Sequence, residues 1–520
     1  MRISLNILFL LICQIIFAQA PVKELLEQNW RIIPSYSNKN KSLEQSKIRL
    51  SSESDGNFNK SRVVLSPTEQ VVLISYNSTD YGVMLITEEL KIKWNTPLTG
   101  LTLGIGKYKD KILVIHTGDI NKKDNWSQIN ATILDPASGK KILTKTILNA
   151  PTDFLFEPKL FFTTDNQEFF LGVRYTETEN KARIFVFGAG IGNFADKYSK
   201  TPKFELLSFN ENLEEIRKVE LPIKKGFYFL QAEMSKKKEI IIMYHEGNGN
   251  FGIQLIANNF IDVKDYRRIS VDLRENANFD MSFSLSGIFI NIIHFTITYQ
   301  NAEKERATAV YRINLDDKIV KSVSVAYNKE YRKKMKEKYK PFNKKADNLS
   351  TGEWDEMEIG DLIEFEDKII CFTEVQLKKQ NIHNNGAPSQ TTITGDAILS
   401  VYDKNLTLID QQIIPKYIEY FGSEGVYTSL FVHDHILTML SGVRTGAFSS
   451  LPLIIDYDLN QNKITRQDIP ERGSVRKSPY ITIDPSCTLW FQKSFVISYR
   501  KEQGVFSAKR SETDMQKFIY

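Results

Sequence analysis

Apolar and polar residues alternate along most of the chain after residue 60, in runs short enough for single strands. Such alternation places every second side chain on one face, as in a strand with one buried side. A helical period of apolar positions is visible in two segments, Pro21–Ile33 and Asn328–Tyr339. The pattern therefore predicts an all-β protein with a short N-terminal helix.

One turn pattern recurs between the predicted strands. An apolar strand ends in a turn rich in Asp or Asn, and an alternating strand follows that is often closed by proline. The eight turns lie at or near Glu88, Asp135, Asn210, Asn259, Asn314, Asp403, Asp458 and Ser511. The closing prolines are Pro97, Pro222, Pro415 and Pro470. Asp and Asn side chains accept hydrogen bonds from turn amides, and an edge strand tolerates proline, so each pattern predicts the outer hairpin of a sheet.

A second pair of strands precedes each outer hairpin, so the repeating unit has about four strands. Radially repeated four-stranded units form β-propellers, whereas two β-sandwich domains would give irregular spacing and no shared turn. We predict a single β-propeller with eight four-stranded blades, with seven blades as the alternative. The predicted segments are a signal peptide (1–18), an N-terminal helix and linker (19–60), blades at 61–99, 100–150, 151–223, 224–275, 276–328, 355–416, 421–471 and 476–520, and a basic inter-blade insertion at 329–354.

The two ends of the chain bear on how the ring closes. The last residues read as an outer strand, which predicts closure between complete blades. The alternative is that residues 47–50 add to the final sheet.

The best-formed turn lies in Ala131–Leu148, ATILDPASGKKILTKTIL. Its strand, Asp-x-x-Ser/Thr-Gly-Lys turn and second strand resemble a repeat of the quinoprotein-like (WD40-like) β-propellers, here an exported one of no assigned function. The resemblance alone would imply a quinone-dependent dehydrogenase. It covers only the outer hairpin, however, and only Trp94 falls at the position of the tryptophan that docks between blades in that family. We therefore expect no cofactor.

The N-terminus has the features of a signal peptide. Arg2 precedes the apolar segment Ile3–Phe17, and small residues follow at a cleavage position between Ala18 and Gln19. A lipoprotein signal is excluded because Ile12, a large residue, precedes Cys13. The longest later apolar run, Gly287–Tyr299, is too short for a spanning helix. We expect an exported, periplasmic or secreted monomer with no transmembrane segment in the mature chain.

The net charge of +5 is unevenly distributed. Residues 329–345 carry nine basic and two acidic residues, and residues 353–367 carry eight acidic residues and no basic one. No basic face with interleaved aromatic residues or recognised nucleic-acid motif accompanies the basic run, so we expect no nucleic-acid partner. The candidate partner-docking residues in the basic run are Arg332, Lys333, Lys334 and Lys336. Of the two cysteines after the signal, Cys371 lies mid-strand and reads as a buried thiol, although pairing with Cys487 stays open.

The longest predicted loops fall on one face of the ring, where connections between second and third strands and between blades meet. They are 77–81, 117–127, 176–181, 246–250, 300–306, 377–396, 444–449 and 500–504, with the insertion at 329–357. Second strands on this face often end in Tyr or His, which predicts a ligand site at the mouth of the channel or, alternatively, residues that fill the wide end of a blade. The candidate residues are Tyr76, His116, Tyr175, His245, Tyr299, Arg444, Tyr499 and Arg500.

No catalytic or metal motif stands out. His433 and His435 are spaced to share a metal on a strand, but no third ligand is identifiable. Gly188–Gly192 lacks the following helix of a dinucleotide site. The leading hypothesis is a non-enzymatic propeller that binds an envelope or extracellular protein, or a glycan, through its loop-rich face. The alternative is a periplasmic or secreted enzyme that acts on polysaccharide or peptide through the channel.

Overall fold

The computed structural model describes thirty-six strands and parts of the segments that join them, which together are the described residues. They are 24–30, 49–50, 62–75, 80–100, 102–118, 128–149, 155–163, 165–176, 200–201, 203–220, 227–234, 239–245, 252–258, 266–272, 283–286, 292–300, 303, 305–328, 330–331, 333, 356–382, 388–414, 416, 418–421, 428–446, 449–468, 481–483, 488–503 and 510–520.

The strands of the described residues form eight antiparallel sheets, which we number in chain order. The first sheet contains β3 (Arg62–Ser66), β4 (Glu69–Ser75), β5 (Asp80–Thr87) and β6 (Ile92–Thr99). The second contains β7 (Thr102–Tyr108), β8 (Lys111–Thr117), β9 (Gln128–Leu134) and β10 (Lys141–Asn149). The third contains β11 (Leu155–Phe162), β12 (Phe169–Thr176), β14 (Lys203–Phe209) and β15 (Glu215–Glu220). The fourth contains β13 (Lys200–Thr201), β16 (Phe227–Met234), β17 (Ile240–His245), β18 (Gly252–Asn258) and β19 (Tyr266–Asp272).

The second half of the chain repeats this plan. The fifth sheet contains β20 (Phe283–Ser286), β21 (Ile292–Gln300), β22 (Arg306–Asn314) and β23 (Val320–Ala326). The sixth contains β24 (Glu356–Phe365), β25 (Lys368–Ile382), β26 (Pro388–Asp403), β27 (Leu408–Ile414) and β28 (Ile418–Phe421). The seventh contains β29 (Ser429–His433), β30 (Ile436–Gly446), β31 (Ser449–Asp458) and β32 (Lys463–Asp468). The eighth contains β33 (Ile481–Ile483), β34 (Leu489–Trp490), β35 (Ser494–Gln503) and β36 (Arg510–Ile519).

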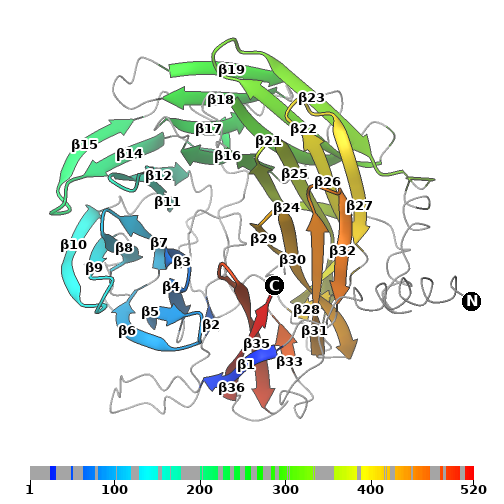
Figure 1. Cartoon of the computed structure of the whole chain (residues 1–520). Coiled ribbons are helices and arrows are strands. Elements are labelled where there is room, and N and C mark those ends of the chain that lie inside the picture. The colour runs from blue at the N-terminus through cyan, green and yellow to red at the C-terminus, as the bar shows by residue number, and fades with distance from the viewer. Residues whose placement is uncertain are drawn as a thin grey trace, which may run out of the picture.

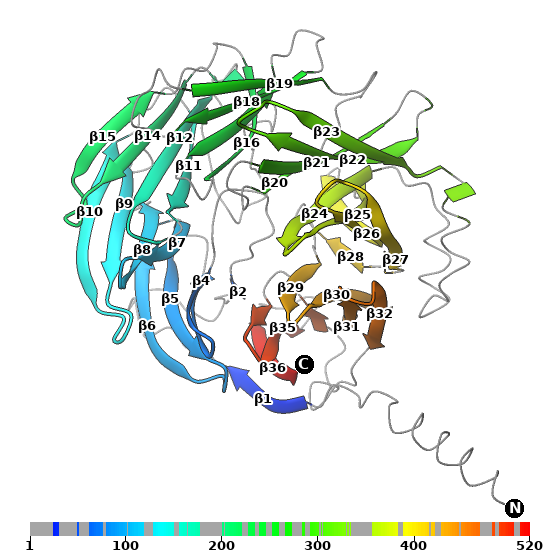
Figure 2. The same cartoon turned by 45° about the horizontal axis from the view of Figure 1, so that its top comes forward.

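The eight sheets follow one another around a common centre, with the first strand of each sheet on the inside (Figure 1). Contacts between neighbouring sheets run mainly through these inner strands, as between β7 and β11 or between β20 and β24. Figure 2 shows the same order of sheets from a second direction. This radial arrangement of four-stranded antiparallel sheets is a β-propeller, and the all-β propeller predicted from the sequence is confirmed.

The chain ends close the ring differently from the prediction. The segment expected to be an N-terminal helix contains a strand, β1 (Glu24–Trp30), which pairs with β36 on the outside of the eighth sheet. The prediction that the last strand is outermost is therefore wrong, because β1 covers it (Figures 1 and 2). Residues near 50 also join a different sheet, since β2 (Arg49–Leu50) pairs with β4 of the first sheet. Hydrogen bonding to a distant strand outweighs the local helical period here.

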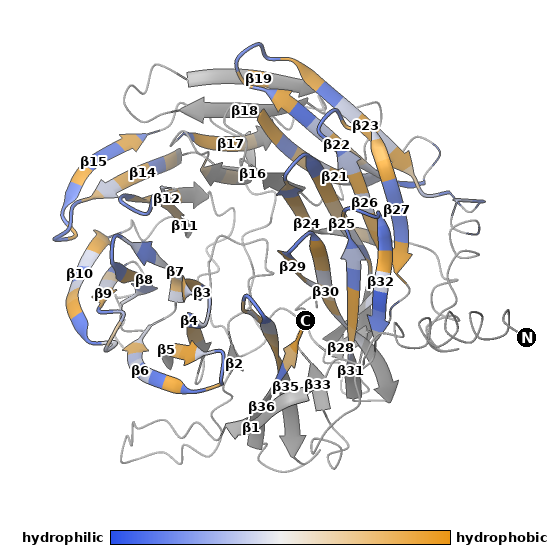
Figure 3. Cartoon of the chain, in the orientation of Figure 1, coloured by the Kyte–Doolittle hydropathy of each residue, from blue (hydrophilic) through white to orange (hydrophobic). Residues whose placement is uncertain are grey.

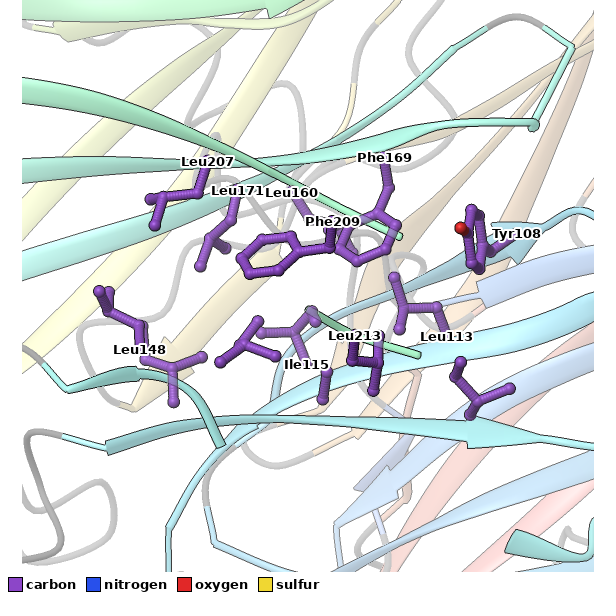
Figure 4. Packing of buried hydrophobic residues seen from close by; sticks show 14 of the residues in the cluster. Tyr108, Leu113, Ile115, Leu148, Leu160, Phe169, Leu171, Leu207, Phe209 and Leu213 are labelled. Carbon is purple, nitrogen blue, oxygen red and sulfur yellow. The ribbon is translucent and has the colours of Figure 1, made fainter. Parts of the chain in front are cut away.

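The apolar core lies between adjacent sheets. Outer strands such as β6, β10 and β15 alternate between hydrophilic and hydrophobic residues (Figure 3), whereas central strands such as β8 are buried along most of their length. Between the second and third sheets, Leu113 and Ile115 face Phe169 and Leu207 (Figure 4). Because both faces of a central strand are covered by neighbouring sheets, alternation marks only the outer strands clearly.

The outer hairpins repeat one backbone conformation. The turn residue before or at the start of the fourth strand has a positive φ angle, between 51° and 69°, at Leu90, Gly139, Leu213, Lys318, Leu406 and Asn462. The Asp or Asn at the head of the turn holds this conformation, as where Asp403 Oδ1 accepts from the Asn405 and Thr407 amides at 2.8 and 2.7 Å. The buried side chain of Leu213 then packs with Leu113 and Ile115 of the preceding sheet (Figure 4). The recurring turn is thus also a contact between sheets.

In the second sheet, the turn residue with the positive φ angle is a glycine, Gly139. Gly139 has no side chain, and the indole of Trp94 from the first sheet lies against it. Trp94 Nε1 donates to the Pro136 carbonyl at 2.9 Å, and Thr96 Oγ1 donates to the Gly139 carbonyl at 2.6 Å. Trp94 therefore occupies the docking position that the resemblance to quinoprotein-like repeats implies.

Candidate functional site

The predicted ring of mouth residues is only partly described. Tyr76 lies outside the described residues. Tyr175 and His245 lie at the ends of β12 and β17, Arg444 lies near the end of β30, and Tyr499 and Arg500 lie within β35. Only the backbone of these five residues is placed. The side chains of His116 and Tyr299 are placed, and both are buried. Those two residues pack between sheets instead of lining an open mouth.

His116 joins the first and second sheets. Its Nδ1 lies 3.1 Å from the Thr99 carbonyl and 3.0 Å from the Thr117 carbonyl, and its Nε2 lies 2.9 Å from Thr132 Oγ1. Carbonyl oxygens only accept, so Nδ1 carries the proton and Nε2 accepts from Thr132. Burial lowers the pKa of His116 from 6.5 to about 4. The imidazole is therefore a neutral connector between two sheets at physiological pH.

Tyr299 belongs to the packing of the fourth and fifth sheets. Its hydroxyl lies 2.5 Å from Ser324 Oγ on the outer strand of its own sheet. Its ring joins the cluster that contains Ile241 and Met243 of the fourth sheet. The alternative interpretation from the sequence, that polar aromatic residues fill the wide part of a blade, describes this residue.

The partner-docking candidates fall mostly outside the described part of the chain. Lys333 is exposed, and its backbone is helical together with Glu330 and Tyr331. Arg332, Lys334 and Lys336 lie outside the described residues, as do the cleavage residues Ala18 and Gln19. Cys371 is buried with its Sγ 3.4 Å from Thr296 Oγ1, and Cys487 is also outside them.

The two histidines considered as metal ligands serve other roles. Asp434 and His435 have φ angles of 43° and 63° and form the tight turn between β29 and β30. His433 Nε2 bonds to Thr438 Oγ1 at 2.9 Å, and its ring stacks on Tyr520 with centroids 3.7 Å apart. Within the described ranges, no group of three His, Cys, Asp or Glu side chains is arranged to hold a metal. No helix in the same ranges is long and apolar enough to cross a membrane.

The sixth sheet contains a buried charge cluster that no pattern in the sequence indicates. Lys416, just after β27, is completely buried, and its Nζ donates to Glu374 Oε1 on β25 and to Thr428 Oγ1 at 3.0 Å. The Thr428 amide also donates to Glu374 Oε1, at 3.1 Å. Burial lowers the pKa of Lys416, while Glu374 and the buried Asp396 oppose the shift. Because Thr428 precedes β29, the cluster also ties the sixth sheet to the seventh.

This cluster lies where the sixth sheet changes its pairing. The β25–β26 register shifts between Glu374 and Gln376. On the far side of β26, pairing with β27 ends at Ala397 and pairing with β28 begins at Thr394. Lys416 lies between β27 and β28, so its side chain enters the sheet at the break in the outer strand. The cluster marks the boundary between the blade proper and an extension of it.

The extension is a hairpin that continues beyond the inner strand. We call Leu377–Ile382 and Pro388–Thr394 the hairpin arm. The inner strand β24 stops pairing at Gln376, whereas β25 and β26 remain paired as far as Ile382 and Pro388. Strand β28 pairs with the arm on its outer side and contacts β30 of the seventh sheet (Figure 1). The sequence predicts residues 377–396 as a loop, and this prediction is wrong for most of the segment, because β25 and β26 extend through it as paired strands.

His116 gives a pH-dependent contribution to stability that can be measured. Since the pKa is about 4 in the folded protein and ordinarily 6.5, the unfolded chain binds the extra proton between these values. Stability is therefore lost as pH falls from about 6.5 toward 4, by about 3 kcal/mol at most. Urea unfolding at pH 7 and pH 4.5 should show a larger loss for the wild type than for His116→Gln. Equal losses in both proteins would contradict this role of His116.

Comparisons with known proteins give structural alignments but no match in sequence. No family model matches the chain, and no curated protein matches it in sequence. The WD40 domain of SCAP from fission yeast aligns with 91% of this chain and 98% of its own, at 8% identity and a TM-score of 0.42. TolB from Acinetobacter baumannii aligns over 76% of each chain, at 11% identity and a TM-score of 0.28. A protein of unknown function from Bacteroides caccae aligns over 67% of this chain and 94% of its own, at 13% identity and a TM-score of 0.27.

The class of the protein is defined by its own sheets. Its four-stranded antiparallel sheets, arranged radially, make it a β-propeller.

Proposed function

We propose that this chain is an exported, non-enzymatic β-propeller that binds an envelope or extracellular protein, or a glycan, through its loop-rich face. The observation that supports it is the hairpin arm of the sixth sheet, which adds paired strands on that face beyond what the blade itself requires. Loops and hairpins carried on a rigid scaffold are the usual sites of recognition. The remaining mouth candidates, Tyr175, His245, Arg444, Tyr499 and Arg500, would then belong to the rim of the same surface.

The basic insertion is a second part of the proposed surface. Lys333 is exposed, and the sequence places Arg332, Lys334 and Lys336 beside it in a run of nine basic and two acidic residues. Such a run raises the association rate with an acidic partner more than the final affinity. The signal at Ala18 and Gln19 would deliver the chain to the periplasm or the medium, where the partner is expected.

A face-specific block tests this function. Ser449→Cys places a thiol on the hairpin between the second and third strands of the seventh sheet, and Ser138→Cys places one on an outer hairpin at the opposite end of its sheet. Each variant is coupled to a bulky maleimide polymer and used to capture partners from envelope fractions and on a glycan array. We expect polymer at residue 449 to abolish capture and polymer at residue 138 to leave it intact.

Two results would contradict the proposal. Capture that is lost equally with either label would show that the loop-rich face has no special role. Turnover of a polysaccharide or peptide by the purified protein would favour the alternative, an enzyme acting through the channel.

A further inference from the structure

Three ionisable side chains are buried on three neighbouring strand lines of the sixth sheet. Glu374 lies on β25, Asp396 on β26, and Lys416 between β27 and β28, which both pair with β26. Their exposed fractions are 0%, 2% and 1%. The Lys416 side chain passes β26 to reach Glu374 Oε1 on the far strand, and Asp396 acts on it electrostatically. Because adjacent strands are only about 4.8 Å apart, the three groups meet inside the sheet.

A β-bulge lies at the position of the aspartate. The β25–β26 register shifts between Glu374 and Gln376, so that Gly395 and Asp396 of β26 lie opposite the single residue Val375. A bulge re-aims side chains out of the ordinary alternation of a strand and is common beside reactive sites. The outer line of the sheet breaks at the same level, because β26 pairs with β27 only from Ala397 onward and with β28 only as far back as Thr394.

The surroundings favour a reaction between the amine and a carboxyl group. Burial lowers the pKa of Lys416, although Glu374 and Asp396 oppose the shift, and a desolvated lysine is a better nucleophile because its neutral form becomes accessible. Thr428 donates from its amide, at 3.1 Å, and from its hydroxyl to Glu374 Oε1. These donors fix the carboxylate beside the amine, where it can accept a proton from Nζ.

We propose that Lys416 and Asp396 form an intramolecular isopeptide bond, with Glu374 as the residue that transfers the protons. Glu374 takes a proton from the Nζ ammonium group, and the amine attacks Asp396 Cγ. The Nζ–Cγ bond forms and one Cγ–O bond breaks. The two protons that the nitrogen loses leave with that oxygen as water, and the charges of the ammonium and the Asp396 carboxylate cancel. The inference goes beyond the proposed function, and the ion pair is the folded state before the bond forms.

Mass spectrometry of the purified full chain tests the proposal. Under denaturing conditions we expect its mass to be lower by one water molecule than the mass of its sequence from the observed N-terminus. Trypsin does not cleave after an acylated lysine, so digestion should release a branched product in which residues 380–404 are joined to residues 405–444. Tandem spectra of this product locate the bond. A chain in which the two segments are separate, or a branch at a carboxyl group other than that of Asp396, would overturn the inference.

Variants separate the three roles. Lys416→Arg keeps the positive charge but offers no amine, so it should have the full mass of its sequence. Asp396→Asn should form the same bond with loss of ammonia in place of water, which identifies Asp396 as the acceptor. Glu374→Gln cannot take up the proton and should reduce the linked fraction by at least about tenfold. A Lys416→Arg chain that still loses water, or a Glu374→Gln chain linked as fully as the wild type, would contradict these roles.

The exposed salt bridge between Lys93 and Glu69 is the control in the same digest. Its lysine side chain is 51% exposed, so the amine stays hydrated and charged, and we expect no branch between the two residues. Circular dichroism of each variant shows whether it is folded when its mass is measured. Lys416→Met and Glu374→Gln both disable the reaction, so the difference between their free energies of unfolding reports the buried charges and not the bond.

Discussion

Replacing Lys416 with methionine is expected to destabilise the protein by about 3–5 kcal/mol, because it leaves buried carboxylates without their cation. Glu374 and Asp396 are both buried and both act on Lys416. Without the ammonium group, both buried carboxylates lose the positive charge that compensates them. Urea unfolding of the purified variants measures the loss of free energy of unfolding.

Replacing Glu374 is expected to lower the free energy of unfolding by less than replacing Lys416. Glu374→Gln keeps Lys416 near Asp396, which continues to offset part of the charge, so the loss should be smaller than for Lys416→Met. Combining Lys416→Met with Glu374→Gln should lower the free energy of unfolding by less than the sum of the two single changes, since the pair acts as a unit. A strictly additive double variant would contradict the coupling.

An exposed pair in the same chain supplies the control. Lys93 and Glu69 form a salt bridge in which the lysine side chain is 51% exposed. Lys93→Met should change the free energy of unfolding by no more than about 1 kcal/mol, because solvent screens exposed pairs. If Lys416→Met cost no more than Lys93→Met, the buried cluster would not have the strength assigned to it.

The parts of the fold that could be predicted are those governed by local chemistry. Asp135 and Asp403 accept hydrogen bonds from amides within the next four residues, so turn residues alone reveal the outer hairpins. Trp94 could be placed as well, because its partner turn resembles a known repeat. The repetition of these turns, with about four strands in each unit, indicates a propeller.

The parts that could not be predicted depend on contacts between distant residues. The helical period of Glu24–Trp30 gives no sign of β36, its partner at the other end of the chain. Lys416 and Glu374 follow no spacing rule that marks an ion pair. His116 and Tyr299 end second strands as expected, but a propeller covers both faces of these strands, so the sequence period could not show that neighbouring sheets enclose them.

The contact between Trp94 and Gly139 makes both residues sensitive to substitution. A Cβ at Gly139 would lie 2.5 Å from Trp94 Cε3, and the φ angle of 69° disfavours any side chain there. Gly139→Leu is therefore expected to cost about 3 kcal/mol or more, from backbone strain and overpacking. Trp94→Ala removes a large buried side chain and its bond to Pro136, at about 3–5 kcal/mol.

The two changes should compensate each other when combined. Leu90, Leu213 and Leu406 occupy the same left-handed turn position in other sheets and are buried, so leucine fits there when no tryptophan fills the space. The double variant Trp94→Ala with Gly139→Leu should be more stable than the sum of the single losses by about 1–3 kcal/mol. Leu213→Gly, which empties the equivalent position of the third sheet, is the matched control and should be destabilising without any change at Trp94. Additive losses in the double variant would mean that the indole and the leucines do not fill equivalent space, and that the shared turn does not set the spacing between sheets.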